Sequence, residues 1–478
     1  MCMRPKLVGI LVAAMLYMGG LTGHASVKLS GIISNKTSDS VSISFSSNRL
    51  AYYPQEFTAV TTAAGAFTIE FPFPEGVYIQ AELKHGVHLS ELMLHDGDSL
   101  MLLADDARFD SSLHYTGKGA AVQNFVVQHV LLRGRVNQYM MRLRNNVGLT
   151  PDAFITALDK ERKEEFSFAD KHKAGLTENF LFFWKAHFTY YNYFFLQQYP
   201  QMHEIMLKNR YTDTIPDANY AVLKAMPAAY DDKLITVPPY LLYLTGVFES
   251  RLRAAGYAQP LYENDNATRF LDSVHKLAYL QLPPRSAEYY IAQSLYARAR
   301  NQPITRTQDQ YAAFRKKWPA SEYTEILDKQ TQLAARLAPG QPAPDLDITT
   351  PDGTHKKLSE LKGNVVYISF WSARVKQTVG EMRADRKIRE VFKNKPVSFV
   401  YVCIDEDAAA AQSVLHQLKL EGNYVWTSGG WYAPEAIAYG VQGLPAHYLI
   451  DTMGNFAMQN PPGPMQKTEL IVAISKLY

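Results

Sequence analysis

The stretch that most constrains the fold spans residues 365–382, where a continuous apolar run changes into a helical pattern. Residues 365–370 read Val-Val-Tyr-Ile-Ser-Phe, a β-branched and aromatic run typical of a strand buried on both faces. Apolar residues then recur at the helical period, at Val375, Val379, Met382, Ile388 and Val391. A buried strand that feeds a helix indicates an open α/β sheet, in which the functional site usually lies at this junction.

The same stretch resembles the active-site region of the thioredoxin-like superfamily, in particular its secreted disulfide reductases of the TlpA/ResA type (AhpC/TSA-like). That family has Phe-Trp-Ala-Ser-Trp-Cys-x-x-Cys-x-x-Glu-Met here, and four positions agree: Phe370, Trp371, Glu381 and Met382. The two cysteine positions hold Val375 and Thr378. Thiol-disulfide exchange needs one thiolate to attack sulfur and a second thiol to resolve the mixed disulfide. The sequence therefore predicts the family's fold without the family's reaction.

A second stretch, residues 439–451, is similar to the family's Tyr-Gly-Val-x-Gly-x-Pro-x-x-x-Leu-Ile-Asp. Its proline position is Pro445, and the resemblance implies that this residue is cis and faces the active-site turn. A Pro-rich linker at 337–346 matches the family's entry segment. The resemblance covers about 140 residues, so we expect a C-terminal α/β thioredoxin fold over 338–478.

At 478 residues the chain is long enough for about three domains. Short alternating runs separated by Asn, Gly and Pro predict an antiparallel β-sandwich or barrel over 26–118, a stretch that resembles the β-rich domain of unknown function often found ahead of such thioredoxin domains. Helical periodicity with proline between the segments predicts an all-α domain over 119–337.

Residues 1–25 have the pattern of a secretory signal peptide. Arg4 and Lys6 precede an apolar stretch at 7–18, which is shorter than the ~20 residues that span a bilayer. Gly23 and Ala25 supply the small residues of a cleavage site, and no cysteine lies nearby for lipid attachment. We therefore expect a periplasmic or secreted protein with no membrane span after cleavage.

The aromatic segment 177–199 permits three interpretations. Its length would suit a transmembrane helix, but Glu178, Lys185 and His187 interrupt it. A surface that stacks ligands is a second alternative. We favour a core helix of the middle domain.

The remaining candidates for chemistry are scattered. Cleavage leaves one cysteine, Cys403, within the strand pattern 397–404, where a buried, inert thiol is expected and a peroxidatic or sensing thiol is the alternative. The acidic residues 405–407 predict a helix cap rather than a metal site. His85, His88 and His95 fall on separate predicted turns, which indicates surface loops. No cofactor or metal is predicted.

The leading hypothesis is a redox-inactive protein that binds a peptide or protein partner in the cell envelope. Family members pair an extended substrate with backbone beside the cis-proline, which requires no sulfur. Partner contacts are expected at Trp371, Arg374, Lys376, Leu444 and Pro445. Two alternatives remain: a disulfide oxidoreductase or peroxidase that uses Cys403, and an anion site at Arg374 and Lys376. The net charge of +3 does not favour nucleic acid.

Overall fold

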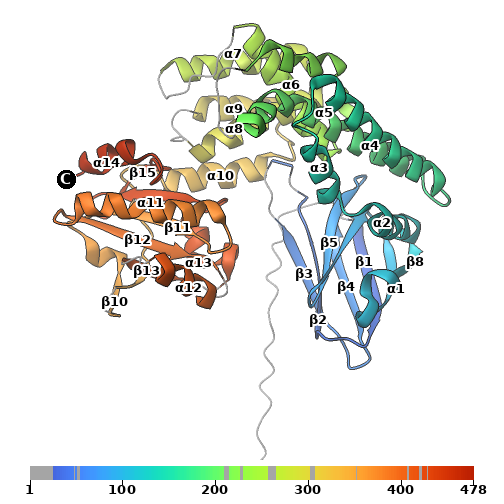
Figure 1. Ribbon diagram of the computed structural model, residues 1–478, viewed down its shortest axis with the longest axis horizontal. Coiled ribbons are helices and arrows are strands. Elements are labelled where there is room, and N and C mark those ends of the chain that lie inside the picture. Colours follow the sequence, from blue (N-terminus) through green and yellow to red (C-terminus); the bar gives the residue numbers. More distant parts are fainter. Residues whose placement is uncertain are drawn as a thin grey trace, which may run out of the picture. The chain divides into compact units, whose positions relative to one another are not determined.

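The computed structural model describes residues 25–47, 49–50, 54–208, 215–226, 230–256, 265–301, 307–350, 353–405, 408–418, 422–427 and 429–478. It forms two compact units, Met1–Tyr257 and Ala258–Tyr478 (Figure 1). The predicted helical region 119–337 is shared between these units. The predicted signal peptide lies outside the described residues, apart from Ala25 at the start of the first strand.

The first unit begins with two four-stranded sheets, ordered β4-β1-β7-β8 and β3-β2-β5-β6, whose inward residues share one hydrophobic core. The strands are β1 Ala25–Ser34, β2 Ser40–Phe45, β3 Gln55–Val60, β4 Ala66–Phe73, β5 Ile79–His85, β6 His88–Leu94, β7 Ser99–Asp105 and β8 His114–Lys118. The prediction of a purely antiparallel arrangement was wrong in one pairing, because β1 and β7 run parallel. Alternation in a sequence reports which face of a strand is buried, and it carries no information on the direction of the neighbouring strand.

Of the three histidines predicted to lie on surface loops, His95 does lie, partly exposed, in the loop between β6 and β7, whereas His85 and His88 lie on strands. His85 is fully buried at the end of β5 and pairs with His88 across the β5–β6 hairpin. Its ring Nδ1 lies 2.9 Å from the Ser40 carbonyl oxygen. His88 Nε2 lies 2.9 Å from a carboxylate oxygen of the buried Asp106. The sequence did not indicate this buried partner, because Asp106 lies more than a dozen residues after His88 along the chain.

The helices of the first unit are α1 Phe109–Ser112, α2 Ala120–Arg133, α3 Val136–Asn145, α4 Pro151–Lys171, α5 Glu178–Lys208 and α6 Pro238–Ala254. Helices α2 and α3 are separated at Gly134, which adopts a φ of +86° where an added Cβ would lie 1.8 Å from the Gln138 amide oxygen. Pro200 lies inside α5 instead of ending it. Among the described residues, no helix has both the length and the apolar character needed to cross a membrane.

The aromatic segment forms part of α5, and it packs against α2 and α3 through edge-to-face ring contacts and against α4 through the stacked rings of Tyr199 and Phe154. His187 lies in this interior with only 4% of its surface exposed. Neither ring nitrogen has a hydrogen-bond partner within the described part of the chain. Burial lowers the pKa of His187 to about 3, so the ring is neutral at physiological pH.

Replacing His187 with Leu is expected to raise the free energy of unfolding at pH 7 by about 1–3 kcal/mol, because a buried polar group without a partner is removed. The gain should grow as pH falls below 6.5, since only the unfolded wild-type histidine then takes up a proton. Urea denaturation measures both effects. His203→Leu is the matched control on the same helix, where Nδ1 lies 2.7 Å from the Val147 carbonyl oxygen, and it should destabilise the protein. Equal destabilisation by both changes would contradict this assignment.

The second unit contains a seven-stranded sheet in the order β10-β9-β13-β12-β11-β14-β15. The strands are β9 Asp347–Thr349, β10 His355–Lys357, β11 Val365–Trp371, β12 Val397–Cys403, β13 Asn423–Trp426, β14 Ala446–Ile450 and β15 Phe456–Gln459. The helices are α7 Asp265–Gln281, α8 Pro284–Asn301, α9 Gln308–Lys317, α10 Thr324–Arg336, α11 Lys376–Phe392, α12 Ala408–Leu418, α13 Pro434–Ala438 and α14 Lys467–Ser475. Central β11 runs parallel to β12 and antiparallel to β14. Helices α11, α12 and α14 pack on one face, and α13 packs on the other.

Helix α10 also packs against this second face, next to the segment that leads to Pro445. Leu333 and Leu337 join the core beneath the sheet. A Cβ added at Gly440 would lie 2.6 Å from the Leu333 side chain, so glycine permits this close approach. The Gln442 amide donates a hydrogen bond to Gln330 at 2.9 Å. The helices that precede the linker therefore support one edge of the candidate site.

Candidate functional site

The turn between β11 and α11 is held by a carboxylate from the neighbouring strand. Asp405, just after β12, accepts hydrogen bonds from the Ser372 hydroxyl at 2.5 Å and the Ala373 backbone N–H at 2.6 Å. The prediction that this acidic residue caps the next helix was wrong, because its side chain binds the turn and α12 begins at Ala408. The other two acidic residues, 406–407, lie outside the described residues.

The two positions of the family cysteines lie at the start of α11. Val375 is its partly exposed N-cap residue. Thr378 is 1% exposed, and its hydroxyl lies 2.7 Å from the Ser372 carbonyl oxygen and 2.8 Å from that of Val375. The hydroxyl proton is directed at backbone oxygens, and no described side chain accepts it as a general base would. The Thr378 hydroxyl therefore stabilises the turn through its hydrogen bonds to the backbone.

Pro445 lies next to this turn, and the Leu444–Pro445 peptide bond is cis. Thr378 and Pro445 line the same small cavity of about 10 Å³. The fold thus brings the two diagnostic stretches of the sequence to one place. Nearly all the space between them is filled.

The predicted partner-binding residues differ in accessibility. Arg374 and Lys376 are exposed, and Leu444 and Pro445 are partly exposed. Trp371 is only 1% exposed, so the prediction that its side chain contacts a partner was wrong. Trp371 is the last residue of β11 and faces the core formed with α11, which covers its ring.

A chain of three polar side chains runs beneath Pro445. His447 Nε2 lies 2.9 Å from Glu381 Oε2, and His447 Nδ1 lies 2.8 Å from the Ser369 hydroxyl. A carboxylate oxygen accepts hydrogen bonds, so Nε2 is placed to donate to Glu381, and in the tautomer with its proton on Nε2 the Nδ1 atom accepts from the Ser369 hydroxyl. Of these residues the sequence pattern singled out only Glu381. His447 and Ser369 occupy a motif's variable position and a strand interior, which carry no separate signal.

This order of groups is that of a hydrolytic triad, but access to the hydroxyl argues against such chemistry. Ser369 is 5% exposed in the middle of β11. The cavity beside it measures about 10 Å³, which leaves no room for an acyl group. Ser369 and His447 therefore act as supports that orient the Glu381 carboxylate.

A second carboxyl lies deeper along α11. Asp385 is 1% exposed, and burial raises its pKa to about 6. The Tyr401 hydroxyl donates a hydrogen bond to its Oδ2, and Arg389 Nε lies 3.6 Å from the same oxygen. Oδ1 has no hydrogen-bond partner within the described ranges. The hydrogen bond and the partial ion pair offset only part of the cost of burying this charge.

An open pocket of about 570 Å³ lies on the outer side of Glu381 and His447. Its lining combines the first turns of α11, the cis-proline and the segment after β15: Gln377, Gly380, Glu381, Pro445, His447, Asn460, Pro461, Gly463, Met465 and Gln466. An added Cβ at Gly463 would lie 3.4 Å from both the Glu381 carboxylate and the His447 ring. The pocket is therefore mixed in character, with one buried carboxylate among amide, proline and methionine groups.

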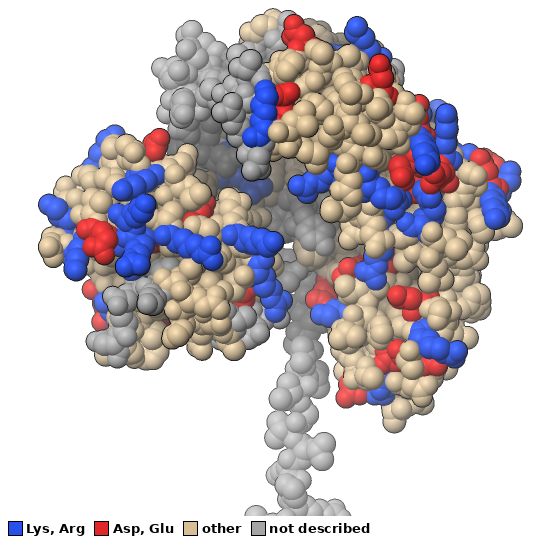
Figure 2. Space-filling view, in the orientation of Figure 1, with Lys and Arg blue, Asp and Glu red and all other residues tan. Residues whose placement is uncertain are grey.

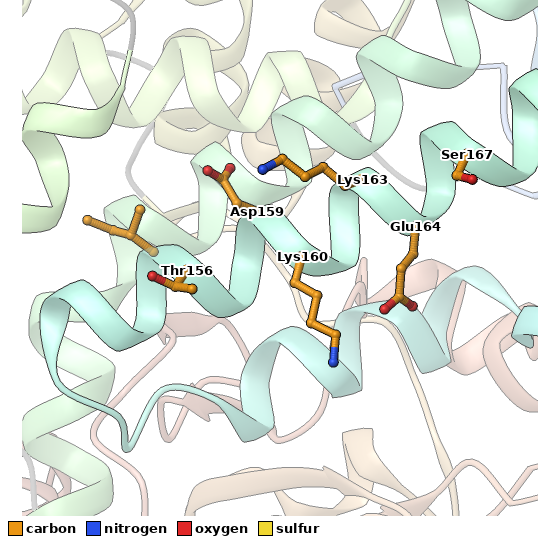
Figure 3. A pocket seen from close by; sticks show the side chains of 7 residues that line it. Thr156, Asp159, Lys160, Lys163, Glu164 and Ser167 are labelled. Carbon is orange, nitrogen blue, oxygen red and sulfur yellow. The ribbon is translucent and has the colours of Figure 1, made fainter.

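A hollow of similar size, about 590 Å³, lies on α4 in the first unit. Figure 3 shows that all of its lining side chains come from this one helix, with Asp159 and Lys163 on one side and Lys160 and Glu164 on the other. These charged groups diverge, and Thr156 and Ser167 are exposed at the ends. We attribute no chemistry to this surface.

Cys403 lies at the end of β12 and is 1% exposed. Burial raises the pKa of its thiol to about 12, and Sγ lies 3.7 Å from Asp405 Oδ2. A reactive cysteine needs an accessible thiolate in an electropositive setting, and this thiol has neither. Within the part of the chain that the structure describes, no cluster of three or more His, Cys, Asp or Glu residues could hold a metal ion.

The C-terminal domain is similar in sequence to known proteins. Residues 338–464 match the Redoxin family. The thiol-disulfide oxidoreductase ResA of Bacillus thuringiensis subsp. konkukian is 29% identical over 139 residues, which cover 29% of this chain and 78% of ResA. ResA of Geobacillus kaustophilus is 26% identical over 148 residues, covering 31% of this chain and 80% of that protein.

Among solved structures, a putative thiol:disulfide interchange protein DsbE from Chlorobium tepidum is 28% identical, covers 30% of this chain and 98% of its own, and has a TM-score of 0.27. Three features agree with a thioredoxin-like fold. They are the order of strands in the sheet, the strand-turn-helix formed by β11 and α11, and the two sequence stretches that match the family. The C-terminal domain of this chain has a thioredoxin-like fold, is similar in sequence to thiol-disulfide oxidoreductases of the ResA type, and matches the Redoxin family model over residues 338–464.

Proposed function

We propose that the protein binds an extended segment of a peptide or protein partner beside Pro445 and performs no thiol-disulfide exchange. The observation that carries this proposal is the pairing of an open 570 Å³ pocket with a turn that lacks sulfur. Thr378, at the second family cysteine position, has its hydroxyl directed at backbone oxygens. Within the described residues the one thiol is Cys403, which is buried on the sheet without a second cysteine to resolve a mixed disulfide.

Free backbone beside the cis-proline supports the binding mode. Within the described residues, no hydrogen bond engages the backbone N–H or carbonyl of Gly443 or Leu444. An extended segment can pair with these groups as an added strand, while one of its side chains enters the pocket. The Glu381 carboxylate at the floor favours a side chain that donates a hydrogen bond.

Reduction of insulin by dithiothreitol tests the absence of redox turnover. We expect the purified protein to give the rate of the buffer control. Alkylation of the native protein is the companion measurement, and Cys403 should remain unlabelled until the protein is denatured. Insulin reduction well above the control, or rapid labelling of Cys403, would favour the alternative of a thiol-disulfide oxidoreductase or peroxidase.

Gly380 offers a direct test of the pocket, because it lies on α11, lines the pocket, and has no atom within 4 Å of an added Cβ. Gly380→Ala should raise the free energy of unfolding by about 0.5–1 kcal/mol, since alanine has the higher helix propensity. Gly380→Trp keeps that benefit in part and fills the pocket.

The binding test uses peptides selected from a random displayed library against the full chain and measured by calorimetry. The Gly380→Trp variant should bind them at least about tenfold more weakly, which corresponds to 1.4 kcal/mol. The Gly380→Ala variant should bind like the wild type. Undiminished binding by Gly380→Trp would place the peptide site elsewhere.

We further propose that the protein acts outside the cytoplasm, in the periplasm or as a secreted protein. This proposal rests on the basic and apolar pattern of residues 1–25. Expression of the full-length chain and N-terminal sequencing of the mature protein should give Ser26 as the first residue. A mature protein that retains residues 1–25 would contradict the cleavage.

A further inference from the structure

The thioredoxin-like domain carries its charge unevenly. Residues 338–478 contain fourteen Lys and Arg and fourteen Asp and Glu, so 14 − 14 gives a formal charge of zero. Residues 374–395 alone contain eight of the basic residues and three of the acidic ones, and 8 − 3 gives +5. Two of these three acids, Glu381 and Asp385, are buried. The exposed surface of α11 and its flanking turns is therefore strongly basic.

Figure 2 shows lysine and arginine side chains gathered on this face of the domain, with few acidic ones among them. Seven of the eight basic residues are exposed, either on α11 or in the turns on its two sides: Arg374, Lys376, Arg383, Arg386, Lys387, Lys393 and Lys395. In the described ranges none of these seven makes an ion pair, and only Arg389 pairs, with Asp385. Exposed lysines on other helices do find partners, as Lys329 does with Glu325 at 2.6 Å.

Four of these residues form one surface, which we call the basic face of α11: Lys376, Arg383, Arg386 and Lys387. Arg383 lies three residues before Arg386 and four before Lys387, spacings at which like charges on a helix repel. Lys376 is the first residue of α11, where the helix dipole disfavours a cation, and the first turn holds no acidic residue. Neither Lys376 nor Arg383 gains stability for the fold from its placement.

The simplest alternative is a solvated helix surface. Glu390 supports that reading in part, because it lies four residues after Arg386 and three after Lys387. Lys393 and Lys395 also need no partner, since cations are favoured after the C-terminal end of a helix. Neither pairing with Glu390 nor a position after the C-terminal end of the helix accounts for Lys376 and Arg383.

We infer that the basic face of α11 binds an acidic stretch of the same partner whose extended segment lies beside Pro445. The inference rests on the proposed function and adds the chemical class of the partner. Continuity of the surface supports it, because Gln377 and Gly380 of α11 line the pocket and Lys376 directly precedes them. From Lys376 to Lys387 the helix rises roughly 16 Å, the length of about five extended residues. A short run of Asp or Glu flanking the bound segment fits this span.

An anionic membrane is the competing source of negative charge. Peripheral helices that lie on a bilayer insert an apolar side into it. Met382, Ile388 and Phe392 of α11 are instead buried against the sheet, and Val391, 47% exposed, is the one large apolar side chain of the helix that faces solvent. A single valine provides little apolar area, so the face offers charge with almost no apolar anchor, which favours an acidic peptide.

The test compares the full-length wild type with R383E/R386E/K387E, which reverses three charges of the basic face. The control, K160E/K163E/K171E, reverses three exposed lysines on α4, and both variants change the formal net charge from +3 to −3. The probe is a fluorescein-labelled, glutamate-rich peptide of about ten residues, followed by anisotropy at about 0.05 and 0.15 M salt. Phosphatidylglycerol vesicles form a second arm.

We expect the wild type and the control to bind the peptide, and the R383E/R386E/K387E variant to bind it about tenfold more weakly at low salt. Added salt should narrow this difference. No binding by the wild type, equal loss in the control, or a loss confined to the vesicles would overturn the inference. The selected peptides and the Gly380→Trp variant report on the proposed function separately, so that function stands or fails independently of this result.

Discussion

The double variant Val375→Cys/Thr378→Cys is expected to reduce insulin, whereas the wild type gives only the background rate. Position 375 is the N-cap residue of α11, where the helix dipole lowers the pKa of a thiol below its usual 8.5. A thiol pKa near 7 would raise the thiolate fraction at neutral pH by about tenfold over an ordinary cysteine. Position 378 lies one helical turn further, next to Pro445, where a second thiol can resolve the mixed disulfide.

The single variants Val375→Cys and Thr378→Cys are the controls, because neither contains a pair. The experiment is made with the chain from Ser26 onward in a Cys403→Ala background, so that the protein's thiols come only from the two introduced positions. We expect insulin turnover only in the double variant, together with an intramolecular disulfide after oxidation. A double variant that stays fully reduced and inactive would show that the turn no longer has the geometry of the family's site.

Asp385→Asn is expected to change how stability depends on pH. The pKa of Asp385 is raised from 3.8 to about 6 in the folded state, so the folded protein binds a proton that the unfolded chain releases between these values. The contribution of this group is therefore fully present below pH 3.8 and is lost as pH rises through 6. A shift of about two units corresponds to about 3 kcal/mol. Asparagine stays neutral and can still accept the hydrogen bond from Tyr401.

The measurement is the difference in free energy of unfolding between the Asp385→Asn variant and the wild type, by urea denaturation from pH 4 to 8. This difference should shift in favour of the variant by roughly 2–2.5 kcal/mol between the two ends of the range, because pH 4 lies slightly above the unfolded pKa. Other groups with raised pKa values, such as Asp98, are present in both proteins and cancel. A difference that stays constant with pH would mean that Asp385 is ionised at little cost in the fold.

The central part of the fold was readable from sequence because its signals are local. Residues 365–371 are all buried, as a run without alternation predicts, and α11 begins after Val375 as the change of period indicates. The two stretches that carry the family resemblance meet at one cavity through Thr378 and Pro445. In these segments, propensity, pattern and tertiary packing favour the same structure.

The parts that sequence could not provide depend on partners distant along the chain. Asp405 follows a strand and precedes a helix, a context typical of a cap, yet its partners are more than thirty residues earlier. His447 and Ser369 are seventy-eight residues apart and become a pair only because β11 and β14 are neighbours. Trp371 matched a site motif but faces the core, because β11 ends with that side of the strand under α11.

Asp405 and Thr378 hold the turn by hydrogen bonds, so the shape of the turn does not depend on a disulfide. Two cysteines at this point would form a disulfide under oxidising conditions and lose it under reducing conditions. Here the hydrogen bonds that hold the turn join oxygen and nitrogen atoms, and none of these groups changes with the redox potential. The surface proposed to bind a partner should therefore keep one shape in reducing and oxidising surroundings alike.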